Sequence, residues 1–181
     1  SAHRALVEYT VFSKDLLTDE EYDAGLNNYI QQHITPGPYQ VLETEKGVIP
    51  MTDYRFPHRT GNIYYIGTAG GNTRGSSGYT FKNIQKHTAA IAQLLKENKT
   101  PDVQNVMGKR AAFYDAVLLR VLGKGYCQGK TVFTRLFKKR KLADVLSFLD
   151  GNSSFFTDLK IITAEPVWPF TKAALGILLG R

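Results

Sequence analysis

The chain has 181 residues, of which 43% are hydrophobic and 22% are charged, as in an ordinary globular domain and unlike a disordered or fibrous chain. Its single cysteine, Cys127, excludes an internal disulfide and any paired-cysteine zinc or redox motif. No apolar run reaches the roughly 18 residues that mark a membrane-spanning helix. The composition therefore favours a folded chain in a reducing compartment, and we expect a cytoplasmic protein.

The net charge of +7 is distributed unevenly. Residues 1–81 carry a net charge of −3, residues 82–141 carry +11 and residues 142–181 carry −1. A basic block of this size indicates an anionic membrane surface, a nucleic acid, or simply a solvated helix face. The basic run at 138–141 leaves the same three interpretations open.

The first 57 residues predict strands and one helix. Alternating β-branched and aromatic side chains over 5–13 predict a strand. Thr18, followed three residues later by Glu21, has the spacing of a capping box and predicts a helix over 19–32. Further short strands are predicted at 39–44 and 48–51.

The rest of the chain predicts one strand followed by helices. The apolar run 63–66 predicts a buried strand. Apolar residues at helical spacing over 81–95 predict an amphipathic helix. Beyond Pro101 the pattern is helical throughout, with glycines between the helices.

A glycine-rich loop, residues 67–80, connects the predicted buried strand to the helix. Its five glycines allow a ligand to approach the backbone, and the N-terminus of the following helix attracts anions. A phosphate or an anionic ring is the expected ligand. The spacing matches neither GxGxxG nor GxxxxGK[ST], so a tight strand-to-helix turn without a ligand stays an alternative.

Candidate catalytic side chains are few. Glu8 shares one face of its predicted strand with Leu6 and Phe12, and a carboxyl group among apolar neighbours holds its proton at neutral pH and can act as an acid. A charge that faces solvent from an edge strand is the alternative. The four histidines have no metal-ligand spacing, so no metal is expected, and Cys127 is given no role.

Three segments together resemble the flavin-dependent lycopene cyclases. Residues 6–10 (Leu-Val-Glu-Tyr-Thr) are similar to that family's Phe-Leu-Glu-Glu-Thr motif, and residues 47–51 (Gly-Val-Ile-Pro-Met) to its Val-Ile-Pro-Met segment. Residues 66–81 are similar to its Ile-Gly-Thr-Ala-Gly-Gly loop and the Gly-Tyr-Thr-Phe that follows. Two departures are that Tyr9 replaces the second acid and that residues 74–77 (Arg-Gly-Ser-Ser) replace a proline-containing stretch, which loosens the loop.

The resemblance implies an α+β fold in three parts. Residues 1–57 correspond to a few antiparallel strands and a helix of a flavoprotein substrate-binding domain, and residues 58–97 to a buried strand, glycine loop and helix of the FAD-binding domain. Residues 98–181 form a helical C-terminal region. The family's GxGxxG half is not in the sequence, so we expect a fragment that is inactive alone.

The resemblance also implies a reaction and its residues. The reaction converts the linear ends of lycopene to β-ionone rings by acid–base carbocation chemistry, with reduced FAD, NAD(P)H as electron source and no net redox change. Glu8 matches the family's acid. The positions that match the flavin loop are Gly67, Thr68, Ala69, Gly70, Gly71, Ser76, Ser77, Gly78 and Tyr79.

A substrate that resides in the bilayer implies a membrane partner. The basic block 82–141 and the apolar stretch 167–179 are expected to hold the protein peripherally on an anionic membrane. No nucleic acid is expected, since the block has no nucleic-acid motif. Two alternatives stay open: an FAD-dependent reductase or monooxygenase acting on another isoprenoid, with Glu8 incidental, and a non-enzymatic basic module that binds nucleic acid.

Overall fold

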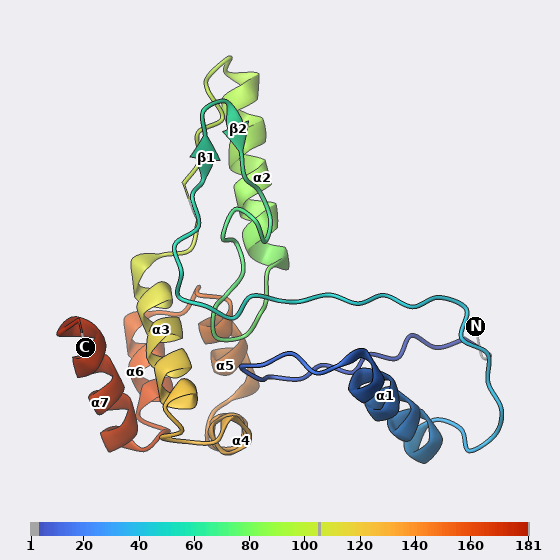
Figure 1. Ribbon diagram of the computed structural model, residues 1–181. Coiled ribbons are helices and arrows are strands. Elements are labelled where there is room, and N and C mark those ends of the chain that lie inside the picture. The colour runs from blue at the N-terminus through green and yellow to red at the C-terminus, as the bar shows by residue number, and fades with distance from the viewer. Residues whose placement is uncertain (1–3, 105, 181) are drawn as a thin grey trace. The chain divides into compact units, whose positions relative to one another are not determined.

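The computed structural model describes residues 4–104 and 106–180. The chain divides into two compact units, residues 1–47 and residues 48–181. Over the described residues the secondary structure is α+β, with seven helices and one small antiparallel sheet (Figure 1). The first unit contains α1, and the second contains the sheet and the other helices.

The first unit is organised around α1 (Asp19–His33). The predicted capping box is confirmed: the Glu21 backbone N–H donates to Thr18 Oγ1 (3.3 Å), and the Thr18 N–H donates to Glu21 Oε2 (2.8 Å). The Tyr9 ring lies against Gly25, where a Cβ would come within 2.6 Å of Tyr9 Cε1. The segment that carries Glu8 is thereby packed on α1.

Replacing Thr18 by Ala is expected to destabilise α1 by about 1 kcal/mol, because the hydroxyl satisfies a backbone N–H of the first turn. Hydrogen exchange of the α1 amides measures the effect. Thr44→Ala, at an exposed position outside the helix of the same unit, is the control and should leave the exchange unchanged. Equal protection of α1 in both variants would contradict the prediction.

Only one strand pair occurs in the described ranges. It is the hairpin of β1 (Arg59–Thr60) and β2 (Ile63–Tyr64), which pair antiparallel. The strands predicted at 5–13, 39–44 and 48–51 are wrong, since none of these segments joins a ladder. Side-chain alternation creates a possible strand face, but a strand also needs a neighbour to satisfy its backbone N–H and C=O groups.

The prediction of a buried strand over 63–66 is also wrong. The strand ends at Tyr64, and the side chains of Ile63 and Ile66 are exposed. Gly61, with φ of +57°, lies in the turn that joins β1 to β2, and the Tyr65 N–H donates to the His58 carbonyl (2.9 Å) next to the ladder. A two-stranded hairpin has no flanking strands to cover its apolar side chains.

The helical predictions of the second unit are confirmed. The predicted amphipathic helix is α2 (Phe81–Lys96), which runs beside the hairpin in Figure 1. Within residues 102–104 and 106–180, five helices follow Pro101 and are separated by short turns. They are α3 (Lys109–Gly123), α4 (Gly129–Lys139), α5 (Leu142–Leu149), α6 (Phe155–Ile162) and α7 (Val167–Leu178).

Two apolar clusters hold these helices together. In the first, α7 packs on α3 through Ala173 and the buried Val117 and Val121. In the second, Leu136, Val145 and Ile161 join α4, α5 and α6. In the part of the chain that the structure describes, none of the helices combines the length and apolar character required to cross a bilayer.

Candidate functional site

The glycine loop, residues 67–80, lies between β2 and α2 and is folded into successive turns. The Asn72 N–H donates to the Gly67 carbonyl (3.0 Å), and the Gly78 N–H donates to the Arg74 carbonyl (2.8 Å). Gly67 and Gly78 have φ of +62° and +71°, which glycine adopts without the steric cost of a side chain. These turns bring the chain from the hairpin to the first turn of α2.

Two other glycines of the loop are required by contacts within the protein. A Cβ at Gly70 would lie 2.4 Å from the Tyr65 carbonyl oxygen, and a Cβ at Gly75 would lie 2.6 Å from that of Thr52. Backbone atoms of the chain itself therefore occupy the space beside these glycines, and a ligand does not need to fill it.

Replacing Gly70 by Ala is expected to destabilise the second unit by about 1–3 kcal/mol, in the range of overpacked sites, because the new methyl group meets rigid backbone. Urea unfolding measures the change. Gly123→Ala is the control, since a Cβ at the end of α3 meets no atom within 4 Å, and it should keep or raise the stability. Equal midpoints for the two variants would contradict the prediction.

Arg74 connects the loop to two helices through a buried network. Its Nε donates to Asp115 Oδ2 (2.7 Å) and its Nη2 to Asp115 Oδ1 (2.6 Å), while its Nη1 donates to the Leu149 carbonyl (2.7 Å). The Ser76 hydroxyl donates to Asp115 Oδ1 (2.6 Å). The side chains of Arg74 and Asp115 are only 3% and 4% exposed. The loop is thus fixed to α3 and to the end of α5.

A second buried network joins the loop to α2 through His87. The Val103 carbonyl, 3.1 Å from His87 Nε2, can only accept a hydrogen bond, so Nε2 carries the hydrogen. Nδ1 then accepts from the Asn72 side-chain amide (2.9 Å). The Asn83 side-chain amide donates to the Asn72 backbone carbonyl (2.9 Å). Sequence reasoning missed His87, because its two partners, Asn72 and Val103, lie in separate segments 15 and 16 residues away along the chain.

The first turn of α2 offers a site for an anionic group. Thr80 makes no side-chain cap; its hydroxyl instead donates to the Gly78 carbonyl (3.1 Å) and lies 3.0 Å from Thr73 Oγ1. No acidic residue occurs in this turn, and Lys82, which lies in it, is paired with Asp150. Backbone N–H groups at a helix N-terminus suit a phosphate or the edge of an anionic flavin.

The loop positions selected from the sequence differ in exposure. Ser76 uses its hydroxyl within the buried network, whereas Tyr79, beside the first turn of α2, is exposed. A ligand would reach the exposed loop positions more easily than the buried ones. Buried are Gly70, Gly71 and Ser76; partly buried are Gly67, Ser77 and Gly78; exposed are Thr68, Ala69 and Tyr79.

Glu8 lies in the first unit, whereas the loop lies in the second. It is exposed, and Oε1 accepts a hydrogen bond from the Thr10 hydroxyl (2.5 Å). Leu6 and Phe12, expected to surround it with apolar surface, are 97% and 63% exposed. The expected apolar strand face around Glu8 is therefore wrong.

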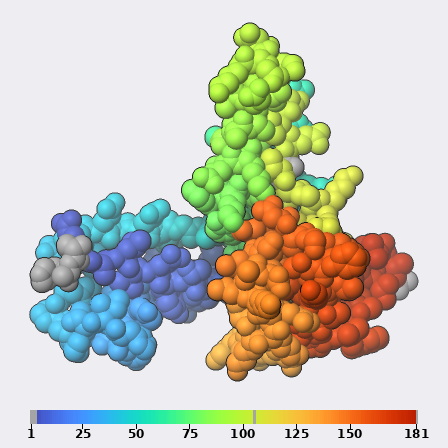
Figure 2. All heavy atoms as spheres, turned by 180° about the vertical axis from the view of Figure 1, so that it is seen from behind, coloured from blue at the N-terminus to red at the C-terminus, as the bar shows by residue number. Residues whose placement is uncertain are grey.

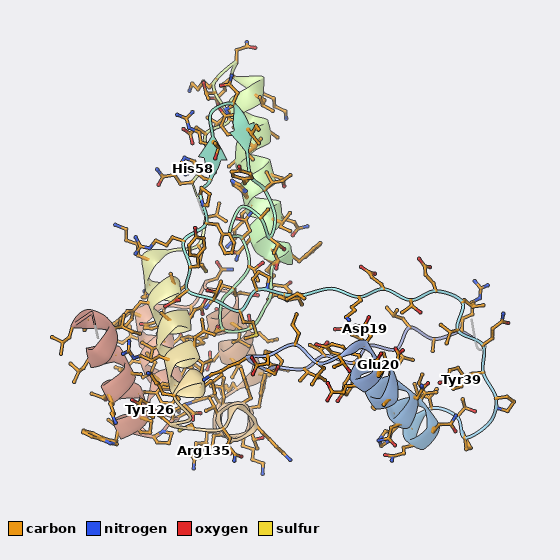
Figure 3. All side chains as sticks on the ribbon, viewed as in Figure 1. Asp19, Glu20, Tyr39, His58, Tyr126 and Arg135 are labelled. Atoms are coloured by element: carbon orange, nitrogen blue, oxygen red, sulfur yellow. The ribbon has the colours of Figure 1, made fainter. Side chains whose placement is uncertain are left out.

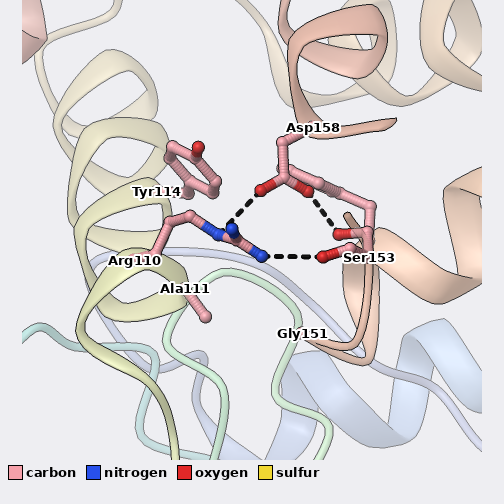
Figure 4. A pocket seen from close by; sticks show the side chains of 7 residues that line it. Arg110, Ala111, Tyr114, Gly151, Ser153 and Asp158 are labelled. Carbon is pink, nitrogen blue, oxygen red and sulfur yellow. Dashed lines mark hydrogen bonds and ion pairs between the residues drawn. The ribbon is translucent and has the colours of Figure 1, made fainter. Parts of the chain in front are cut away.

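A small pocket lies between α3 and the start of α6 (Figure 4). Arg110 Nε lies 2.9 Å from Asp158 Oδ2, its Nη2 donates to the Ser153 carbonyl (2.7 Å), and the Ser153 hydroxyl donates to Asp158. Burial and the neighbouring Asp158 raise the pKa of Tyr114. This ion pair and these hydrogen bonds connect α3 to the start of α6. Nowhere in residues 4–104 and 106–180 do three or more potential ligands gather for a metal ion.

A family model described as lycopene cyclase protein matches residues 1–175. The matched stretch contains Glu8, the entire glycine loop and both partners of the Arg74–Asp115 ion pair. No curated protein and no solved structure gives a significant match to the chain.

Proposed function

The chain belongs to the lycopene cyclase family, and on this premise we propose that it takes part in converting the linear ends of lycopene to β-ionone rings. The family match over residues 1–175 carries the proposal. Membership of this family implies that the substrate is a linear carotenoid and that the protein acts in carotenoid biosynthesis.

The reaction needs no net oxidation or reduction. An acid protonates the terminal double bond, the neighbouring alkene closes on the resulting cation, and a base removes a proton from the new ring. One proton is added and one is lost, so the product is an isomer of the substrate. The protein has to provide a positioned acid, a base and surroundings that stabilise positive charge.

Glu8 is the proposed acid. Its segment is packed on α1 through Tyr9 and Gly25, which limits its motion, while the carboxyl itself stays open to an approaching molecule. An apolar carotenoid lying over Glu8 would displace water from the carboxyl and favour its protonated form. The Thr10 hydroxyl, which donates to Oε1, would orient the carboxyl group.

Reduced FAD is the proposed cofactor, with NAD(P)H as electron source. The first turn of α2 and the exposed Tyr79 would hold it. When bound, reduced anionic FAD supplies negative charge that stabilises a carbocation. The buried loop residues, among them Ser76, act by holding the loop in shape.

The proposal includes peripheral docking on an anionic membrane on the cytoplasmic side, because the substrate is a hydrocarbon. The +11 charge of residues 82–141 supports it.

Expression of the full-length protein in a bacterium that accumulates lycopene tests the activity. Cyclic carotene in the extracted pigments is the expected result. Unchanged lycopene, with folded protein present in the cells and an active lycopene cyclase working in parallel in the same host, would overturn the proposal. Another modified isoprenoid would indicate a different reaction of the same flavoprotein superfamily and would also overturn it.

A further inference from the structure

Exposed apolar side chains gather beside lysines at one end of the helices of the second unit. Where α4 leads into α5, Phe137 is 47% exposed and Leu142 61%. Where α6 leads into α7, Val167 and Trp168 are 73% and 74% exposed. In Figure 1, α4 and the start of α7 both lie at the lower end of these helices, and Figure 2 shows the same end from behind.

Hydrogen bonds hold the two junctions side by side. Lys139 Nζ donates to the Ala164 carbonyl (3.2 Å), and Arg140 Nη2 donates to Thr163 Oγ1 (3.2 Å). Arg135, from the preceding turn of α4, is at the same end in Figure 3. The apolar side chains of both junctions and the lysines between them therefore form one surface. We call it the basic–apolar end, defined by Phe137, Lys138, Lys141, Leu142, Val167 and Trp168.

The charge at this end is almost entirely positive. Asp144, in the first turn of α5, is half-buried. Glu165 is 8% exposed, and burial raises its pKa against the opposing effect of Arg135 and Lys139. Residues 124–141 contain no acid. Their basic residues are Lys124, Lys130, Arg135, Lys138, Lys139, Arg140 and Lys141.

We propose that the basic–apolar end docks on an anionic lipid bilayer, with Trp168, Val167 and Phe137 in the headgroup region and Lys138 and Lys141 against lipid phosphates. This deepens the proposed function by assigning its membrane partner to a surface. The indole of tryptophan and the long stems of lysine both favour the boundary between hydrocarbon and water.

Charge decides against a second copy of the chain as the occupant. Two copies of this end face to face would place like charges opposite one another. A nucleic acid would contact the lysines and leave the aliphatic Val167 and Leu142 without a partner. A bilayer satisfies both kinds of side chain at once, because its phosphates lie directly above its hydrocarbon.

Trp168 is the single tryptophan of the chain, so intrinsic fluorescence reports directly on this surface. The full chain is mixed with vesicles of phosphatidylcholine alone or with one quarter phosphatidylglycerol. With the anionic vesicles we expect a blue shift of the tryptophan emission and protection from iodide quenching. Both changes should be much weaker with the neutral vesicles and should diminish at high salt, because salt screens the attraction.

Matched variants identify the surface. Lys138→Gln with Lys141→Gln should weaken vesicle binding about 30-fold, at roughly 1 kcal/mol per charge. Lys96→Gln with Lys99→Gln removes two charges at the end of α2 and should change binding little.

Trp168→Ser should weaken binding to the anionic vesicles, as measured by sedimentation. Phe156→Ser, which removes an equally exposed aromatic ring at the start of α6, should weaken it much less.

Three results would overturn the proposal. One is no binding to either vesicle, and another is binding without a change in Trp168 emission, which would place the contact on another surface. The third is a blue shift that grows with protein concentration in the absence of lipid, which would identify a second copy as the occupant. Vesicle binding needs no catalysis, so a protein that docks but does not cyclise would contradict only the proposed activity.

Discussion

Replacing Asp115 by Ala is expected to lower the free energy of unfolding of the second unit by about 3–5 kcal/mol, as is typical when one partner of a buried ion pair is removed. The Asp115 carboxylate accepts two hydrogen bonds from Arg74 and one from Ser76. Its loss leaves the buried Arg74 guanidinium with one remaining hydrogen-bond partner, the Leu149 carbonyl. The glycine loop then loses its connection to α3.

Urea unfolding of the Asp115→Ala variant measures this effect, and an exposed ion pair provides the control. Asp102 lies 3.0 Å from His58 Nε2 and 3.5 Å from Arg59 Nη1, with its side chain 35% exposed. Asp102→Ala should therefore cost less than about 1 kcal/mol. The double variant Arg74→Met with Asp115→Leu should recover much of the loss, since it leaves no unpaired buried charge. Equal unfolding midpoints for the two single variants would contradict the prediction.

The helices could be predicted because their signals are local. A capping box needs only Thr18 and Glu21, three residues apart, and the apolar stripe of α2 repeats within its own length. The strands could not be predicted in the same way, since a strand depends on a partner that no short pattern reveals. The alternating segment around Glu8 resembles a strand in sequence but joins no ladder in the described part of the chain.

The loop illustrates what sequence patterns miss. Its glycines mark a place where the backbone is crowded, and the structure shows that at Gly70 and Gly75 the neighbour is the chain itself. The partner of Arg74 is 41 residues away on α3. From the sequence, Arg74 and Ser76 were departures from a family motif; in the structure they are the residues that hold the loop to the helices.

Replacing Glu8 by Gln is expected to abolish cyclisation or to reduce it by about 10²- to 10⁴-fold, the usual contribution of a general acid. An amide has nearly the shape of a carboxyl group but cannot supply the proton that starts ring closure. Glu8 is exposed and lies outside any helix or strand, so the change should leave folding intact, and the unfolding midpoint verifies this.

Glu43→Gln is the matched control, because it removes an exposed carboxyl in an irregular segment of the same unit. In a lycopene-accumulating bacterium, the Glu43→Gln protein should yield as much cyclic carotene as the unaltered protein, while the Glu8→Gln protein leaves lycopene. Equal yields from both variants would place the acid elsewhere without contradicting the cyclase activity. Loss of cyclisation in both variants would mean that the first unit tolerates no change of charge. Proton donation by Glu8 would then not be the explanation for the inactivity of the Glu8→Gln protein. The difference between two chemically identical substitutions in one unit therefore separates proton donation from structural support.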